Sequence, residues 1–143
     1  MEQEELIDIK PTLKSGLDFV IEQSDYLTGI HILMPYIEEL IRRIVKKAGK
    51  VEVVLEQHKT KFFRCIMLDG LLENENVKEV IGVDFQKSLK VLLTDRDQVN
   101  LRNELLHGRL PSDKINEAET VFVSYCILKL LKILKDFRKE IPQ

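Results

Sequence analysis

The chain has 143 residues, of which 44% are hydrophobic and 32% charged, with six glycines and four prolines. This length and composition are typical of one compact helical domain with a buried core. A formal net charge of −2 excludes a broadly basic nucleic-acid-binding surface, so any RNA contact must be local. The two cysteines and three histidines form no cluster at metal-ligand spacing, and we expect neither a metal ion nor another cofactor.

The N-terminal residues predict a cytoplasmic protein with an arm ahead of its domain. The acidic start at Met1 to Glu5 is unlike a basic signal peptide, and the apolar runs of the chain are too short for a membrane span. Residues 1–14 contain Pro11 and show no sustained apolar period, so we expect an arm or linker there. Residues 15–143 would then form an all-α domain.

A long amphipathic helix is predicted from about Ser24 to Ala48, because its apolar residues fall on one arc of a helical wheel. Gly49 suits the position just after its end, and Pro35 inside the helix predicts a kink or a local break near Tyr26 to His31. A stripe flanks the apolar arc and consists of His31, Pro35, Glu38 and Arg42. In this stripe Glu38 either forms a surface pair with Arg42 or faces another helix.

Shorter elements are predicted in the middle of the chain. Val51 to Val54 resembles a strand without a partner, so we interpret it as an extended connector. Thr60 can cap a helix that runs to about Leu72. A helical turn from Val77 to Ile81 should end at Gly82, and Asp84 should cap a further helix through Leu93.

The stretch from Asn100 to Gly108 assembles groups that suit chemistry on a phosphodiester. Arg102 supplies a permanent charge and a planar donor fork, while His107 can exchange a proton near neutral pH. On an ideal helix these two side chains point about 140° apart. Asn103 and His107 share a face, so the amide could hydrogen-bond the ring and fix its tautomer. Arg102 falls in an apolar arc and needs a partner, such as Glu38, a phosphate or a second subunit.

The last helix is predicted from about Asp113 to Lys139 and is apolar on most of its faces between Val121 and Leu134. A helix that is hydrophobic nearly all round is either enclosed by its own bundle or shared with a second subunit. Few other helices are available to enclose it in a chain of 143 residues, so the sequence predicts a homodimer.

The chain resembles the HEPN superfamily (higher eukaryotes and prokaryotes nucleotide-binding domains), whose ribonucleases carry an arginine, a polar residue and then a histidine. Arg102, Asn103 and His107 match that pattern, and the resemblance covers roughly residues 26–134. The flanking residues, Asn100 and Gly108 beside the motif and Glu38 and Arg42 upstream, also match uncharacterised HEPN-like C-terminal domains of longer proteins. The resemblance implies a HEPN-like helical bundle with one long kinked helix, shorter middle helices and a long apolar C-terminal helix.

The resemblance also implies an activity. HEPN ribonucleases cleave RNA without a metal, leaving 2′,3′-cyclic phosphate and 5′-hydroxyl ends, some of them as toxins or in antiviral defence. His107 would be the general acid or base, Arg102 would stabilise charge on the phosphoryl oxygens, and Asn103 would orient the ring. The family builds its site across a dimer, and an antitoxin or a fused domain is a further expected partner.

Three cations near the motif in sequence, Arg96, Arg109 and Lys114, are candidate substrate-binding residues, or else solvated loop charges. Two alternatives to catalysis remain. The chain could be a non-catalytic helical module that dimerises or binds a nucleotide or RNA. The motif could also be structural, with Arg102 paired to Glu38 and His107 bonded to a carbonyl at the helix end.

Overall fold

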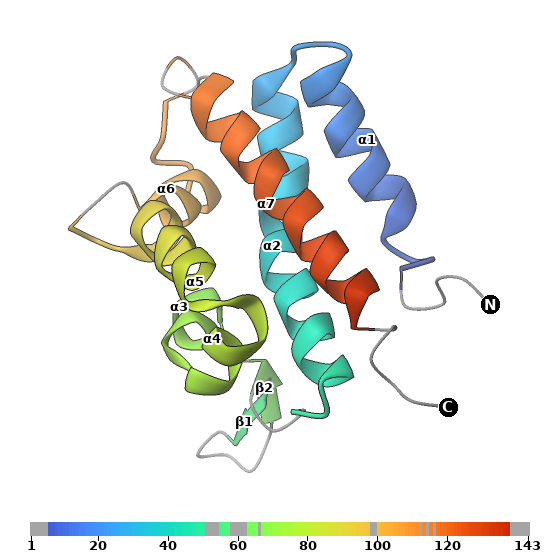
Figure 1. The fold of residues 1–143 in the computed structure, drawn as a ribbon. Helices are drawn as coiled ribbons and strands as arrows, with labels where there is room; N and C mark the ends of the chain where they lie inside the picture. The colour runs from blue at the N-terminus through green and yellow to red at the C-terminus, as the bar shows by residue number, and fades with distance from the viewer. Residues whose placement is uncertain are drawn as a thin grey trace.

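A computed structural model describes residues 6–50, 55–57, 63–65, 67–97, 100–111, 113, 115 and 117–137. Three long helices, α1 (Lys10–Ile21), α2 (Tyr26–Lys47) and α7 (Glu117–Asp136), pack together, and α2 makes its most extensive contacts with α1 and α7 (Figure 1). The shorter elements lie on one side of this layer: α3 (Leu68–Glu73), α4 (Glu75–Ile81), α5 (Val83–Leu89), the π-helical turn η2 (Lys90–Thr94) and α6 (Leu101–Leu106). The described chain is therefore a helical bundle.

Helix α2 provides the centre of the core. Its buried apolar side chains are at most 1% exposed and comprise Ile30, Leu33, Met34, Ile37, Leu40, Ile41, Ile44 and Val45. The predicted helix is confirmed to within two residues at each end. Gly49 adopts a φ of +79°, and the Lys50 amide donates to the Val45 carbonyl at 3.0 Å, the pattern of a left-handed helix end. Of the kink or local break expected from Pro35, the break is wrong, because α2 continues through this residue as one helix, and the kink stays a prediction.

The expected arm at residues 1–14 is wrong in its extent, because α1 already begins at Lys10. Pro11 occupies the first turn of α1, where its missing amide proton leaves no intrahelical bond unmade. Helices α1 and α2 approach closely at their glycines. A Cβ atom on Gly29 would lie 2.3 Å from Val20 Cγ2, so only glycine permits this contact.

The segment after α2 includes a short antiparallel hairpin that the sequence did not predict. Strand β1 (Leu55–Gln57) pairs with β2 (Phe63–Cys65). The helix expected from Thr60 is thus wrong at β2, and the next helix that the structure describes begins at Leu68. The connector expected at Val51 to Val54 and the proposed cap Thr60 lie outside the described residues.

The other middle elements follow the predicted pattern in part, and the helix expected through Leu93 is α-helical only to Leu89 and continues as the π-helical turn η2. Helix α4 ends at Gly82, which has a φ of +92°. The same glycine, rather than Asp84, is the N-cap of α5, and Asp84 lies in the first turn of that helix. The long C-terminal helix is present as α7, and none of the described helices has the length and apolar character needed to cross a membrane.

Candidate functional site

Helix α6 carries the arginine-histidine motif and begins from an unusual backbone conformation. Its N-cap Asn100 has a φ of 48° and a ψ of 38°, a left-handed conformation that asparagine tolerates better than most residues. The side-chain oxygen of Asn100 accepts a hydrogen bond from Asn103 Nδ2 at 2.8 Å. The first turn of α6 is thereby fixed by an amide pair three residues apart.

Arg102 reaches from α6 to α2. Its Nη2 donates to Glu38 Oε2 at 3.1 Å, and its Nη1 donates to Asn103 Oδ1 at 2.9 Å. The side chains of Glu38 and Arg102 are only 10% and 14% exposed, so this ion pair is largely shielded from water. The contact expected between Glu38 and the motif helix is therefore confirmed.

Glu38 is shared by two arginines. Its other oxygen, Oε1, accepts a hydrogen bond from Arg42 Nη2, so the pair expected within α2 is present as well. Arg42 is 14% exposed, as is Arg102. One largely shielded carboxylate therefore holds two guanidinium groups, and its two oxygens fix their relative position.

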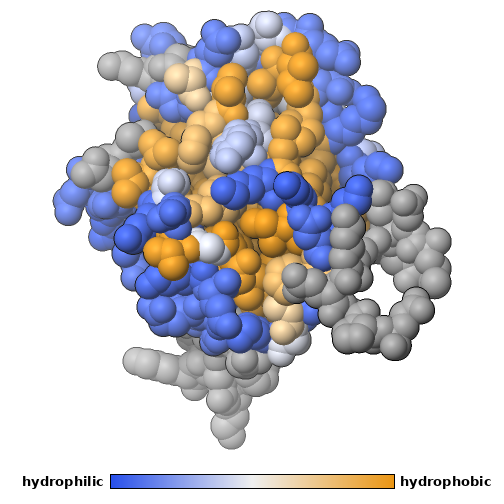
Figure 2. Space-filling view, in the orientation of Figure 1, coloured by the Kyte–Doolittle hydropathy of each residue, from blue (hydrophilic) through white to orange (hydrophobic). Residues whose placement is uncertain are grey.

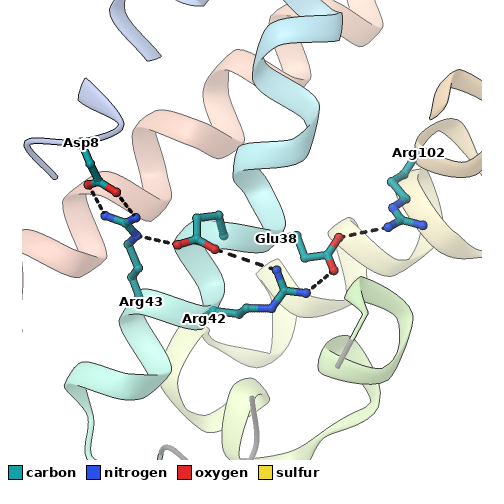
Figure 3. Close-up of polar contacts among 6 residues, drawn as sticks. Asp8, Glu38, Arg42, Arg43 and Arg102 are labelled. Atoms are coloured by element: carbon teal, nitrogen blue, oxygen red, sulfur yellow. Dashed lines mark hydrogen bonds and ion pairs between the residues drawn. The ribbon is translucent and has the colours of Figure 1, made fainter. Parts of the chain in front are cut away.

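A row of contacts between opposite charges extends from Arg42 along α2 to Asp8, which precedes α1 (Figure 3). Arg42 Nη1 lies 4.0 Å from Glu39 Oε2, and Arg43 Nε donates to Glu39 Oε1 at 2.8 Å. Arg43 also donates to both oxygens of Asp8, at 2.9 and 2.8 Å. Its hydrogen bonds lower the pKa of Asp8 to about 2, and Asp8 in turn raises the pKa of Arg43 above its ordinary value.

The expected pairing of Asn103 with the His107 ring is wrong. The amide of Asn103 instead accepts from Arg102 and donates to Asn100, which occupies its oxygen and one of its N–H groups. Helix α6 ends at Leu106, so His107 is its C-cap and is exposed, bonded to Asn103 only through its backbone amide at 3.0 Å. Asn103 therefore positions Arg102 rather than His107.

Of the three cations expected to bind substrate, two are exposed at the surface and one lies outside the described residues. Arg109 is exposed and forms an ion pair with Glu104 of α6 at 3.1 Å. Arg96 is exposed in the turn after η2. Lys114 lies outside the described residues. The structure thus brings Glu38, Arg42, Arg102 and Asn103 together, and it leaves Arg96 and Arg109 at the surface.

A pocket that the sequence did not predict lies beside the motif helix. An open cavity of about 230 Å³ is lined by Leu92 of η2, Leu101 of α6 and three residues of α7, namely Ala118, Glu119 and Phe122. Leu101 precedes Arg102 directly, so the cavity adjoins the motif helix. No sequence signal indicated it, because its walls come from three elements that only the fold brings together.

Among the residues that the structure describes, no three His, Cys, Asp or Glu side chains gather closely enough to hold a metal ion. The comparisons add no family: no protein-family model matches the chain, and neither a curated protein nor a solved structure matches it.

Proposed function

We propose that this protein is a metal-independent endoribonuclease of the HEPN type, acting in the cytoplasm in toxin-related or antiviral defence. The observation that carries the proposal is the fixed position of Arg102. Glu38 and Asn103 hold two of its nitrogens, yet a guanidinium has five N–H donors. Its Nε is buried and has no hydrogen-bond partner among the described residues, so the donors left for a ligand are the second hydrogens of Nη1 and Nη2. The guanidinium of Arg102 is thus held in one orientation and still has N–H groups that could donate to a phosphate oxygen.

The proposed reaction is an internal transesterification of RNA. His107 takes the proton of a ribose 2′-hydroxyl, the 2′ oxygen forms a bond to phosphorus, and the bond from phosphorus to the 5′ oxygen breaks. The leaving oxygen takes up a proton and becomes a 5′-hydroxyl, while a 2′,3′-cyclic phosphate remains. Arg102 stabilises the charge that grows on the non-bridging phosphoryl oxygens.

The site needs two copies of the chain. On an ideal helix, side chains five residues apart, like those of Arg102 and His107, point about 140° apart and are separated by about 7.5 Å along the axis. Arg102 also faces inward to Glu38, whereas His107 is exposed at the end of the helix. In the proposed homodimer, Arg102 of one copy faces the partner subunit's His107 across a shared cleft.

The experiment that tests this function is cleavage of RNA by purified protein in the presence of a chelator. The proposal predicts fragments with 2′,3′-cyclic phosphate ends from wild type and their loss in His107→Ala. Transfer RNA, ribosomal RNA and messenger RNA would be assayed in parallel. Intact RNA in all three assays, from protein shown to be folded, would contradict the proposal.

One observation favours a second function, a non-catalytic helical module that associates with another copy, an antitoxin or a fused domain. Helix α7 exposes large apolar side chains on its outer face, among them Tyr125 at 54% and Leu128 at 50%. An interaction module would keep its association and its nucleotide or RNA binding when His107 is replaced, and it would cleave nothing.

A further inference from the structure

The outer face of α7 carries a stripe of exposed side chains with opposite charges at its two ends. The stripe consists of Glu117, Val121, Tyr125, Leu128 and Lys132, all of them exposed. At 100° per residue these five positions fall within an arc of about 80° and extend over about 22 Å. They lie opposite the buried side of α7, which contains Val123, Ile127, Leu130 and Leu134.

The apolar centre of this stripe is poorly covered. Val121, Tyr125 and Leu128 are 49%, 54% and 50% exposed, and they are consecutive along one helix face. Figure 2 shows hydrophobic side chains gathered over the face of the molecule that α7 crosses in Figure 1. Scattered apolar residues are normal on a protein surface, whereas a continuous row indicates an interaction site.

The order of charged and apolar residues along the stripe indicates which partner would bind to it. Glu117 and Lys132 are equally far from a point between Ser124 and Tyr125, and Val121 and Leu128 are also equally far from that point. When two identical helices pack antiparallel across a two-fold axis at that point, each acidic end meets a basic end. The stripe is thus complementary to itself in charge as well as in hydrophobicity.

We propose that the outer face of α7 binds a second copy of this chain, with the two α7 helices antiparallel around a two-fold axis beside Tyr125. Glu117 of one copy pairs with the partner subunit's Lys132, and the reverse pair forms at the other end. Val121 packs on the partner subunit's Leu128, and the two Tyr125 rings lie next to each other at the axis. This pairing uses only α7 and does not depend on ribonuclease activity.

The dimer should be weak. A contact through one helix face buries less than the roughly 800 Å² per partner of a standard interface, so association depends on concentration. Lys129 weakens it further. Its ammonium lies 4.6 Å from the centre of the Phe85 ring and 5.9 Å from the centre of the Tyr125 ring, so each copy brings a positive charge close to the axis.

Sedimentation velocity over a wide concentration range tests the pairing by charge reversal. Wild type should approach twice the chain mass of 16.7 kDa as its concentration rises. Glu117→Lys and Lys132→Glu should each weaken association, since each places like charges at both ends of the pair. The double variant should restore it, because the opposite charges then meet again with exchanged positions.

A matched pair of valine variants controls for folding and general surface charge. Val121→Glu should give a monomer, while Val91→Glu should associate like wild type, because Val91 is 44% exposed on η2 and lies outside the stripe. Circular dichroism should show native helix content in both. A wild type that remains monomeric at all concentrations, or a dimer that Val121→Glu leaves intact, would overturn the proposal.

Two further outcomes separate this inference from the ribonuclease proposal. Loss of association in Val121→Glu without rescue by the double reversal would overturn the antiparallel register. RNA cleavage by a protein whose association is insensitive to Val121→Glu would overturn the α7 interface while leaving the proposed enzyme standing.

Discussion

Glu38 and Arg102 are 64 residues apart in the chain and are joined by a hydrogen-bonded ion pair of 3.1 Å. The pair connects α2 to α6 in a place where both side chains are largely shielded from water. Asn103 and Arg42 hold the two ends of this pair by their own hydrogen bonds. The position of the motif helix on the bundle therefore depends on a specific polar contact as well as on packing.

Replacing Glu38 by glutamine should lower the free energy of unfolding by about 3 kcal/mol. The substitution leaves two shielded guanidinium groups, Arg42 and Arg102, without the carboxylate they share. Urea unfolding measures the change. Glu104→Gln is the control, since it removes the exposed pair with Arg109 and should cost less than about 1 kcal/mol. Equal losses in both variants would mean that shielding does not strengthen the Glu38 contacts.

Arg102→Lys should reduce RNA cleavage by about 100-fold or more, although the charge is kept. Lysine lacks the second nitrogen arm, so it cannot donate to Glu38 and Asn103 at once and still present a donor to phosphate. Initial rates on one RNA substrate measure the loss. Arg96→Lys should cleave at nearly the wild-type rate, because Arg96 is exposed and a point charge there suffices. Full activity in Arg102→Lys would contradict the proposal that the Arg102 guanidinium binds the phosphate.

His107→Ala should leave the free energy of unfolding within about 0.5 kcal/mol of wild type while it abolishes cleavage. The imidazole is exposed at the C-cap of α6, so no packing is lost when it is removed. Thermal and urea unfolding provide the stability readout. A loss of 2 kcal/mol or so would instead support the structural interpretation, in which the ring satisfies a carbonyl at the helix end.

Acid should weaken the attachment of the N-terminal turn to α2. The pKa of Asp8 falls from 3.8 to about 2 beside Arg43, so its contribution to stability is present above the unfolded pKa. That contribution disappears as the pH falls from about 4 toward 2. Urea midpoints of wild type and Asp8→Asn should therefore differ at neutral pH and converge in acid. A difference that stays constant through this range would show that the Asp8 pKa is not depressed.

The parts of the fold that the sequence predicted are those with a local signal. The period of apolar residues and Gly49 place α2, and the helical spacing of Glu38 from the core arc indicates the face that meets Arg102. The hairpin of β1 and β2 carries no such signal, because three-residue strands are stabilised by pairing across the chain and show too little alternation.

Two errors concern single residues whose neighbours decide their role. Pro11 lies in the segment expected as an arm, but at the first turn of α1 it is compatible with the helix. Asn103 and His107 are one helical turn apart, and the backbone bond between them is present at 3.0 Å. The side-chain amide of Asn103 is bonded instead to Arg102 and Asn100, and a wheel diagram cannot show this competition.

The central claim is that Arg102 of one copy and the partner subunit's His107 act on the same phosphodiester. Mixing Arg102→Lys with His107→Ala, each inactive alone, tests it most directly after the subunits have exchanged. Half of the dimers are then mixed, and each contains one intact site, so the account predicts recovery of about a quarter of the wild-type cleavage rate. A mixture as inactive as its components, with subunit exchange verified, would contradict a site shared between two copies.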